Sequence, residues 1–293
     1  MTPLTVSSTA AGSVDADTTL VADPRARARA RRRKIVVRVL QIAVFVVFVG
    51  GWELLSQTHV LDPFFFGQPS RVGVQMWDWL QNGTEAGSIW TQVAVTMEEA
   101  LLGFACGVAA GIASGIALGR VQMLSKVFGP YIKILNSIPR IVLGSIFIVW
   151  LGLGLSSKVA LAFVLVFFAV FFNAYQGTRE VDRNLIANAR ILGASGRQVT
   201  TQVVLPSALT WIIASLHVSF GFALIGAIVG EFLGAQKGLG LLIRQAQDTF
   251  NPNAVFAAMV IIAVVALAAE GLITLLERSL LSWRPPQLSG TEL

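Results

Sequence analysis

The sequence predicts an all-α integral membrane protein with six transmembrane helices, and three observations lead to this fold class. Hydrophobic residues make up 55% of the 293 residues and charged residues only 13%, whereas a soluble domain is roughly one quarter charged. Six segments are apolar over the ~20 residues that a helix needs to cross a bilayer. Most lysines and arginines lie in connections on one side of these segments, as membrane insertion requires.

The six apolar segments set the expected domain organisation. They run approximately over residues 35–55, 92–118, 128–153, 158–176, 207–232 and 253–276. The residues before them are rich in Ala, Ser, Thr and Asp and then in Arg, a composition typical of a disordered segment. We therefore expect a disordered basic cytoplasmic tail over 1–34, a transmembrane domain over 35–285 and a short cytoplasmic tail over 286–293.

The distribution of basic residues predicts the orientation in the membrane. Arginine and lysine in short connections stay on the cytoplasmic side. The basic run 25–34, the second connection near residue 120, the long loop 178–206 and the C-terminal end then lie inside. Arg71, Lys158, Lys237 and Arg244 fall outside. Both termini are therefore expected in the cytoplasm.

The region 59–89 is external in this topology. It contains a Pro/Phe-rich stretch followed by an amphipathic piece over 71–80 with Met76, Trp77 and Trp79. This pattern is typical of an interfacial helix with an aromatic belt. A contact surface for an external partner is the alternative.

Glycines repeat at a spacing of four along the second segment. They are Gly103, Gly107, Gly111, Gly115 and Gly119. Residues four apart share a helix face, and small residues let two helix backbones approach closely in lipid. We expect the stripe to pack against another helix, and a smooth wall of a translocation path is the alternative.

Polar side chains at membrane depth are costly and often functional. The third segment contains Pro139, which predicts a kink because proline lacks an N–H, and Arg140 follows it. Arg140 is expected either to face a solute path and attract an anion or to pair with Glu270 in the sixth segment. The fifth segment contains His217 and Glu231, and His217 is more typical of an interhelical hydrogen bond. The predicted solute path comprises Pro139, Arg140, His217 and Glu231.

The loop between the fourth and fifth segments is too long for a simple connector, and long loops usually have a function. An amphipathic helix is expected from residue 184, with Leu185, Ile186, Ala189 and Leu192 on one face. Gly193 permits a left-handed turn. A second helical piece over 195–204 should be broken at Leu205-Pro206, where the proline opens the next membrane helix.

This loop resembles the signature of permease subunits of binding-protein-dependent ABC importers. The family pattern is Glu-Ala-Ala, three residues, Gly, nine residues, Ile, one residue and Leu-Pro. Gly193 and Leu205-Pro206 match it at full spacing, Val203 replaces the isoleucine, and Ala187-Asn188-Ala189 stands in place of Glu-Ala-Ala.

Other runs resemble the nitrate/sulfonate/taurine branch of that family. They are the GQPS run near residue 67, IVWLGLGLSSKV from Ile148, NARILGAS, GEFLGAQKGLG from Gly230 and LERSLLSWRPP. The resemblance covers about residues 64–285. That branch often has an arginine shortly before the Gly-Phe of the second segment, whereas this chain has Glu98 and Glu99 before Gly103-Phe104.

The resemblance implies a type I ABC importer permease in which the loop forms a coupling helix on a separate ATPase subunit. The implied partners are that nucleotide-binding subunit, a second permease copy in a homodimer, an external solute-binding protein and the bilayer, without nucleic acid. The solute would be a small anion such as a sulfonate, nitrate or a taurine-like compound. The implied coupling residues are Ala187, Asn188, Ala189, Arg190, Leu192, Gly193, Ala194, Ser195, Arg197, Val203, Leu205 and Pro206.

The sequence contains no Gly-Lys dipeptide and hence no phosphate-binding loop. ATP and Mg are therefore expected on the partner, with no cofactor, metal or catalytic residue in this chain. The single Cys106 excludes an internal disulfide. An ion-coupled secondary transporter and a membrane scaffold or receptor are the alternatives.

Overall fold

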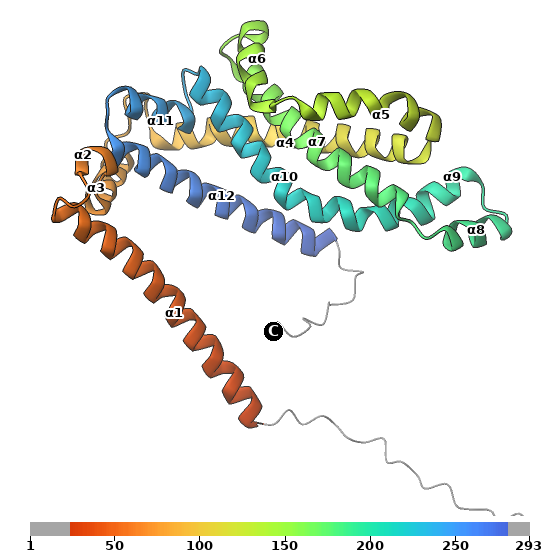
Figure 1. Ribbon diagram of the computed structural model, residues 1–293, viewed down its shortest axis with the longest axis horizontal. Coiled ribbons are helices and arrows are strands. Elements are labelled where there is room, and N and C mark those ends of the chain that lie inside the picture. The colour runs from red at the N-terminus through yellow and green to blue at the C-terminus, as the bar shows by residue number, and fades with distance from the viewer. Residues whose placement is uncertain (1–23, 281–293) are drawn as a thin grey trace, which may run out of the picture. The chain divides into compact units, whose positions relative to one another are not determined.

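The structure is a computed structural model in which residues 24–280 are described, and these residues are almost entirely helical (Figure 1). The elements are α1 Pro24–Gln57, α2 Pro63–Phe66, α3 Pro69–Gln81, α4 Ile89–Arg120, α5 Gln122–Ser137, η1 Arg140–Val142, α6 Leu143–Leu151, α7 Leu155–Arg179, α8 Arg183–Ile191, α9 Gly196–Val199, η2 Thr200–Val204, α10 Leu205–Leu233, α11 Leu239–Asp248 and α12 Pro252–Leu280.

The chain divides into a unit that ends at Leu55 and a unit that begins at Ser56. The first unit consists of most of α1, whose portion Arg32–Gln57 is long and apolar enough to cross a membrane. The helix begins at Pro24, so the basic run 25–34 is helical and not disordered as expected. Arginine and alanine are strong helix formers, which accounts for this extension. The tail residues 1–23 and 281–293 lie outside the described residues.

The second unit holds the other candidate spans. Four are single helices, at Ile89–Arg120, Leu155–Arg179, Trp211–Leu233 and Pro252–Leu275. The expected third span over 128–153 is not one continuous helix, because α5 and the η1–α6 piece meet at an angle of 78°. Pro139 lies at the break, which confirms the predicted kink. The described chain thus has five candidate spans, or six with the bent pair counted as one.

The glycine stripe of α4 faces α7. A Cβ built on Gly107 would lie 2.7 Å from the Cβ of Val166, and one on Gly115 would lie 2.7 Å from the Cβ of Ala174. Gly103, Gly111 and Gly119 meet Ala162, Val170 and Thr178 in the same way. The α7 partners also recur every four residues, so the two helices run parallel in close backbone contact along their length.

Helix α10 packs antiparallel on another face of α7. A Cβ on Gly226 would overlap the backbone of Ala162, and one on Gly177 would lie 2.9 Å from the Cβ of Trp211. Apolar side chains of α4, α7, α10 and α12 fill the space between the helices, among them Val166 and Phe220. Helices α4, α7, α10 and α12 are called the bundle below.

A second apolar core lies at the end of the bundle where α4 and α7 begin. Val72 and Trp79 of α3 pack there with Leu239 and Leu242 of α11 and with Ala257 of α12. Figure 1 shows α3 and α11 at this end and α8 and α9 at the opposite end. Helix α11 was not anticipated from the sequence, and its 10 residues are too few to span a bilayer.

The glycine contact predicts that a single methyl group at the interface is destabilising. Gly107→Ala should lower the stability of the detergent-solubilised protein by about 1–3 kcal/mol, because the added Cβ overlaps Val166. The measurement is thermal unfolding followed by fluorescence-detected size exclusion.

Gly221→Ala is the matched control on α10. No atom lies within 4 Å of the place that its added Cβ would take, so its melting temperature should stay equal or rise slightly. Equal melting temperatures for Gly107→Ala and wild type would contradict the close α4–α7 contact.

Candidate functional site

The loop between α7 and α10 is a small folded unit. Helix α8 begins after Asp182, whose carboxylate accepts a hydrogen bond from Asn184 N at 2.8 Å. Gly193 has φ +84°, a left-handed conformation that favours glycine. Ser195 then caps α9 in a reciprocal pair of hydrogen bonds with Gln198. Each turn of the loop therefore has its own local stabilisation.

Apolar contacts hold the loop against itself. Val181, Val199 and Val204 are buried together, and Ile186 and Ala189 of α8 pack against them. At the far side, Ile191 is 81% exposed and Leu192 is 87% exposed. One face of the loop is thus packed against its own apolar core, and the other face carries exposed apolar side chains.

The expected coupling residues occupy both faces. Ala189, Ala194, Val203, Leu205 and Pro206 are half-buried, whereas the others are exposed, namely Ala187, Asn188, Arg190, Leu192, Gly193, Ser195 and Arg197. Of the four residues expected on one apolar face, Ile186 and Ala189 pack against the loop core, whereas Leu185 and Leu192 are exposed.

The expected break at Leu205-Pro206 is absent. Residues Thr200–Val204 form a π-helical turn that leads directly into α10, and Pro206 lies in the first turn of α10 as predicted. A wider turn accommodates a proline without a helix break, because the ring replaces an N–H that has no intrahelical partner there.

The residues expected along a solute path do not form one site. Arg140 donates a hydrogen bond to Asn136 and lies 4.8 Å from the ring centre of Phe168. Its contacts are thus with α5 and α7 and not with Glu270 of α12. Exposed Pro139 precedes it, and His217 is half-buried on α10. Glu231 lies at the end of α10 remote from the loop.

Glu231 is the centre of a buried polar cluster at that end. Its side chain is fully buried. Thr96 Oγ1 of α4 donates to one carboxylate oxygen at 2.6 Å, and Gly240 N donates to the other at 2.7 Å. Leu239 N in turn donates to Thr96 Oγ1 at 2.9 Å. Glu231 therefore joins α4, α10 and the start of α11.

Two further features complete this polar cluster. Gln92 accepts a hydrogen bond from Gly238 N at 2.7 Å and donates one to Ala86 O at 2.9 Å. Gly238 has φ +112°, and the Glu231 carboxyl occupies the place where its side chain would be. The Lys-Gly-Leu-Gly run of the sequence is thus a tight turn wrapped around Glu231.

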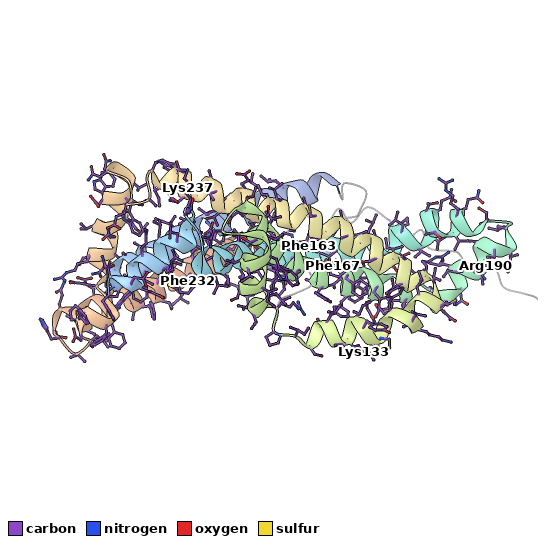
Figure 2. The ribbon with its side chains drawn as sticks, turned by 90° about the horizontal axis from the view of Figure 1, so that it is seen from above. Lys133, Phe163, Phe167, Arg190, Phe232 and Lys237 are labelled. Carbon is purple, nitrogen blue, oxygen red and sulfur yellow. The ribbon has the colours of Figure 1, made fainter. Side chains whose placement is uncertain are left out.

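A cavity of about 240 Å³ adjoins the cluster. It is lined by residues from α4, from the start of α7 and the connection before it, and from the connection after α10, including Glu98, Glu99, Lys158 and Lys237. Figure 2 shows Lys237 and Arg190 of the loop well separated along the molecule. The sequence singled out Glu231 but missed Gln92, Thr96 and Lys158, which a lone sequence does not bring together.

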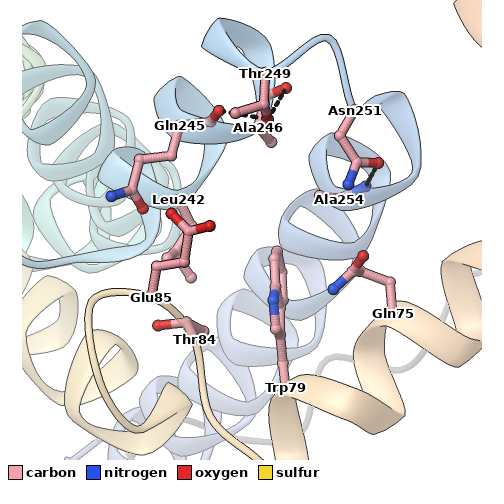
Figure 3. Close-up of a pocket in the computed structure, with 10 residues that line it drawn as sticks. All are labelled: Gln75, Trp79, Thr84, Glu85, Leu242, Gln245, Ala246, Thr249, Asn251 and Ala254. Carbon is pink, nitrogen blue, oxygen red and sulfur yellow. Dashed lines mark hydrogen bonds between the residues drawn. The ribbon is translucent and has the colours of Figure 1, made fainter.

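A smaller cavity of about 110 Å³ lies between α3, α11 and α12 (Figure 3). Trp79 points into it between Glu85 and Gln75. Several lining groups already have local partners, since Thr249 Oγ1 donates to Gln245 O at 2.9 Å and Asn251 accepts from Ala254 N at 3.1 Å. Within residues 24–280, no three His, Cys, Asp or Glu side chains are grouped to hold a metal ion.

Removal of the Glu231 carboxylate should destabilise the turn between α10 and α11. Glu231→Ala leaves Gly240 N without its buried acceptor, at about 1–3 kcal/mol, and leaves Thr96 Oγ1 with the carbonyl of Gln92 as its remaining acceptor. The melting temperature in detergent should fall by several degrees. Glu98→Ala, at an exposed glutamate of α4, should leave it unchanged, and equal values for both variants would rule out this role of Glu231.

Comparison with known proteins identifies the family. Residues 107–282 match the family described as binding-protein-dependent transport system inner membrane component. The chain is 33% identical over 238 residues to a Bacillus subtilis protein named as an aliphatic sulfonates transport permease, SsuC, covering 81% of this chain and 85% of that protein.

Two other relatives have different names. The riboflavin transport system permease protein RibX of Chloroflexus aurantiacus is 32% identical, with 79% of this chain and 85% of that protein covered. The taurine transport system permease protein TauC of Escherichia coli is 26% identical, with 83% and 89% covered. Systems of this kind include a separate ATPase and a solute-binding protein, which are the partners of this subunit. The chain belongs to the inner membrane permease components of binding-protein-dependent ABC importers.

Proposed function

We propose that the loop from Asp182 to Pro206 is the surface on which the ATPase subunit docks. The observation that carries this proposal is the exposure of Ile191 and Leu192 on a loop that has its own apolar core. Exposed apolar side chains on a folded segment are typical of a protein–protein interface. Arg120 of α4 also donates to Gly196 O at 3.4 Å, which ties the loop to a second helix of the bundle.

The continuous helix from α9 into α10 supports the coupling role. A displacement of α9 also displaces α10, because no loop separates α9 from α10. The other end of α10 carries Glu231, which is bonded to α4 and to the turn before α11. ATP-driven movement of the loop thus reaches the opposite end of the bundle through one helix.

The docking surface also determines the proposed orientation. ATP is in the cytoplasm, so the loop and the ends of α4 and α7 near it face inward. Both termini then lie in the cytoplasm, in agreement with the clustering of basic residues. The Glu231 cluster and its cavity face outward.

We propose in addition that two copies of this chain form the solute path. A bent third span leaves α6 with Val149 82% exposed and Trp150 74% exposed. Six spans form half of the usual path, and a second copy supplies the same surfaces by symmetry. The names of the sulfonate and taurine relatives support a small sulfonate as the solute.

The docking proposal predicts that a charge on the loop prevents binding of the ATPase. Leu192→Asp places a carboxylate on a side chain that is 87% exposed, so the permease should still fold while the docking contact is lost. Co-purification of the ATPase from membranes should fall at least tenfold, since burial of an unpaired charge costs about 2 kcal/mol or more.

Val60→Asp is the control. It introduces the same charge at a side chain that is 70% exposed and far from the loop in sequence, and ATPase recovery should match wild type. If Leu192→Asp retains the ATPase in full, the loop is not the docking surface.

The solute path predicts a separable effect for Arg140. Arg140→Gln should reduce the initial rate of sulfonate uptake in proteoliposomes and leave ATPase recovery unchanged, because a fixed cation at membrane depth attracts an anion. Loss of the assembled complex instead would show that the contacts with Asn136 and Phe168 are structural.

A further inference from the structure

Helix α5, the first half of the bent third span, has no buried face. None of its 16 residues is buried in the described part of the chain. A hydrogen bond of 2.7 Å joins Ser125 Oγ to the hydroxyl of Tyr175 on α7. Exposed apolar side chains continue along the helix, among them Phe128 and Ile134. A membrane helix of this kind needs an apolar partner that the described chain does not supply.

A cavity of about 100 Å³ lies between α5, α4 and α7. Its walls are mostly apolar and include Leu118, Ile132 and Phe171. Gly129 also lines it, and no atom lies within 4 Å of the place that a Cβ on Gly129 would take. The cavity therefore includes an open apolar slot beside the middle of α5, in which an alkyl chain can lie.

Two cations flank the polar edge of this cavity. Arg179 Nη1 donates a hydrogen bond to the Tyr175 hydroxyl at 2.7 Å. Lys133 lines the cavity and interacts electrostatically with Tyr175. Side chains of a helix point toward its N-terminus, so Lys133 extends toward the end of α5 at Ser125. The positive charge is thus concentrated at the end of the cavity near the loop.

These cations have no acidic partner on their own helices. The sequence contains no Asp or Glu between Glu99 and Glu180, a stretch that includes all of α5, α6 and α7. Glu180 follows Arg179 and accepts a hydrogen bond from Gln176. Asp182 accepts one from the first turn of α8. The two nearest acidic residues in the sequence therefore have partners of their own, and the complement of the cavity edge is an anion.

We propose that this cavity, together with the adjoining face of α5, binds one phospholipid with an anionic head group from the cytoplasmic leaflet. The head-group phosphate lies between Lys133 and Arg179, and an acyl chain runs past Gly129 toward the bend at Pro139. The placement rests on the proposed orientation, in which the loop faces the cytoplasm. In that orientation the cations lie at the head-group end, and the apolar slot leads toward the centre of the bilayer.

The apolar surroundings favour a lipid over a free anion. A small anionic solute satisfies the cations but not the apolar walls, and the exposed side chains beside the cavity include Val127, Phe128 and Tyr131. An amphiphilic molecule satisfies both. Basic pockets between membrane helices on the cytoplasmic side are typical sites for anionic head groups. The lipid would supply the apolar partner that α5 lacks and would join α5 to α7.

The test measures lipid preference in the complex of permease and ATPase. The complex is purified in detergent and incubated with equal amounts of phosphatidylglycerol and phosphatidylcholine that carry the same acyl chains. Native mass spectrometry of the intact complex gives the ratio of the two lipids retained, which should favour phosphatidylglycerol in wild type. Lys133→Gln should lower this ratio about fivefold, which corresponds to the ~1 kcal/mol that one basic residue contributes near an anionic head group.

Lys126→Gln is the matched control on the same helix. It removes the same charge from an exposed side chain that does not line the cavity, so the ratio should stay close to that of wild type. An equal fall in both variants would show a diffuse attraction to the basic surface and no site. That result, or an unchanged ratio in Lys133→Gln, would overturn the proposal.

Gly129→Leu tests the apolar slot without a change in charge. The new side chain occupies open space on α5, so the protein should fold and retain less phosphatidylglycerol than wild type. Gly271→Leu places the same side chain in open space on α12 and should retain as much as wild type. Equal retention by the two glycine variants would contradict an acyl chain in the slot.

Two further outcomes would assign the surface to another occupant and overturn the proposal. Displacement of phosphatidylglycerol by excess ethanesulfonate would place the cations in the solute path. Loss of a second permease copy from the Lys133→Gln complex, with an unchanged lipid ratio, would make α5 an interface between copies. Recovery of the ATPase is measured in the same sample, so normal recovery without any lipid preference defeats this inference alone and leaves the docking surface standing.

Discussion

The close contact between α4 and α7 is the constraint on which the rest of the structure depends. Lipid provides little hydrophobic force between helices, so association relies on dispersion at short range. The glycines of α4 meet small or β-branched residues of α7 along five successive turns. This contact fixes the depth of both helices, and with it the positions of Glu99 at one end and Arg120 at the other.

Helix α10 connects the two functional ends that this frame separates. It continues directly from the loop through a π-helical turn and carries Glu231 near its other end. Its antiparallel packing on α7 uses glycine at several positions, including Gly226 and Gly230. Small side chains interdigitate little between helices. Tilting of α10 against α7 is therefore less hindered by steric contact than it would be in a core of large side chains. In the proposed docking mode, movement of the loop reaches the Glu231 cluster through α10.

The Glu231 cluster differs from the rest of the membrane domain in its hydrogen bonding. Its hydrogen bonds run between segments far apart in sequence, as from Thr96 to Glu231 and from Gly238 to Gln92. Buried polar networks of this kind stabilise one arrangement when fully satisfied and are costly when a member lacks a partner. Both carboxylate oxygens of Glu231 have donors, so the part of this side chain in the cluster is structural.

The sequence by itself determined the elements whose causes are local. Hydropathy located the spans, Pro139 located the bend, a spacing of four placed the glycines on one face, and the Gly193 and Leu205-Pro206 spacing indicated the family. Only the tertiary structure decided which helix the glycines meet, that Leu185 and Leu192 of the loop remain exposed, and that α11 packs at the end of the bundle remote from the loop. It also decided that Glu99, Lys158 and Glu231 share one site. The physical reason is that burial and charge pairing depend on distances between segments, and no single segment encodes these distances.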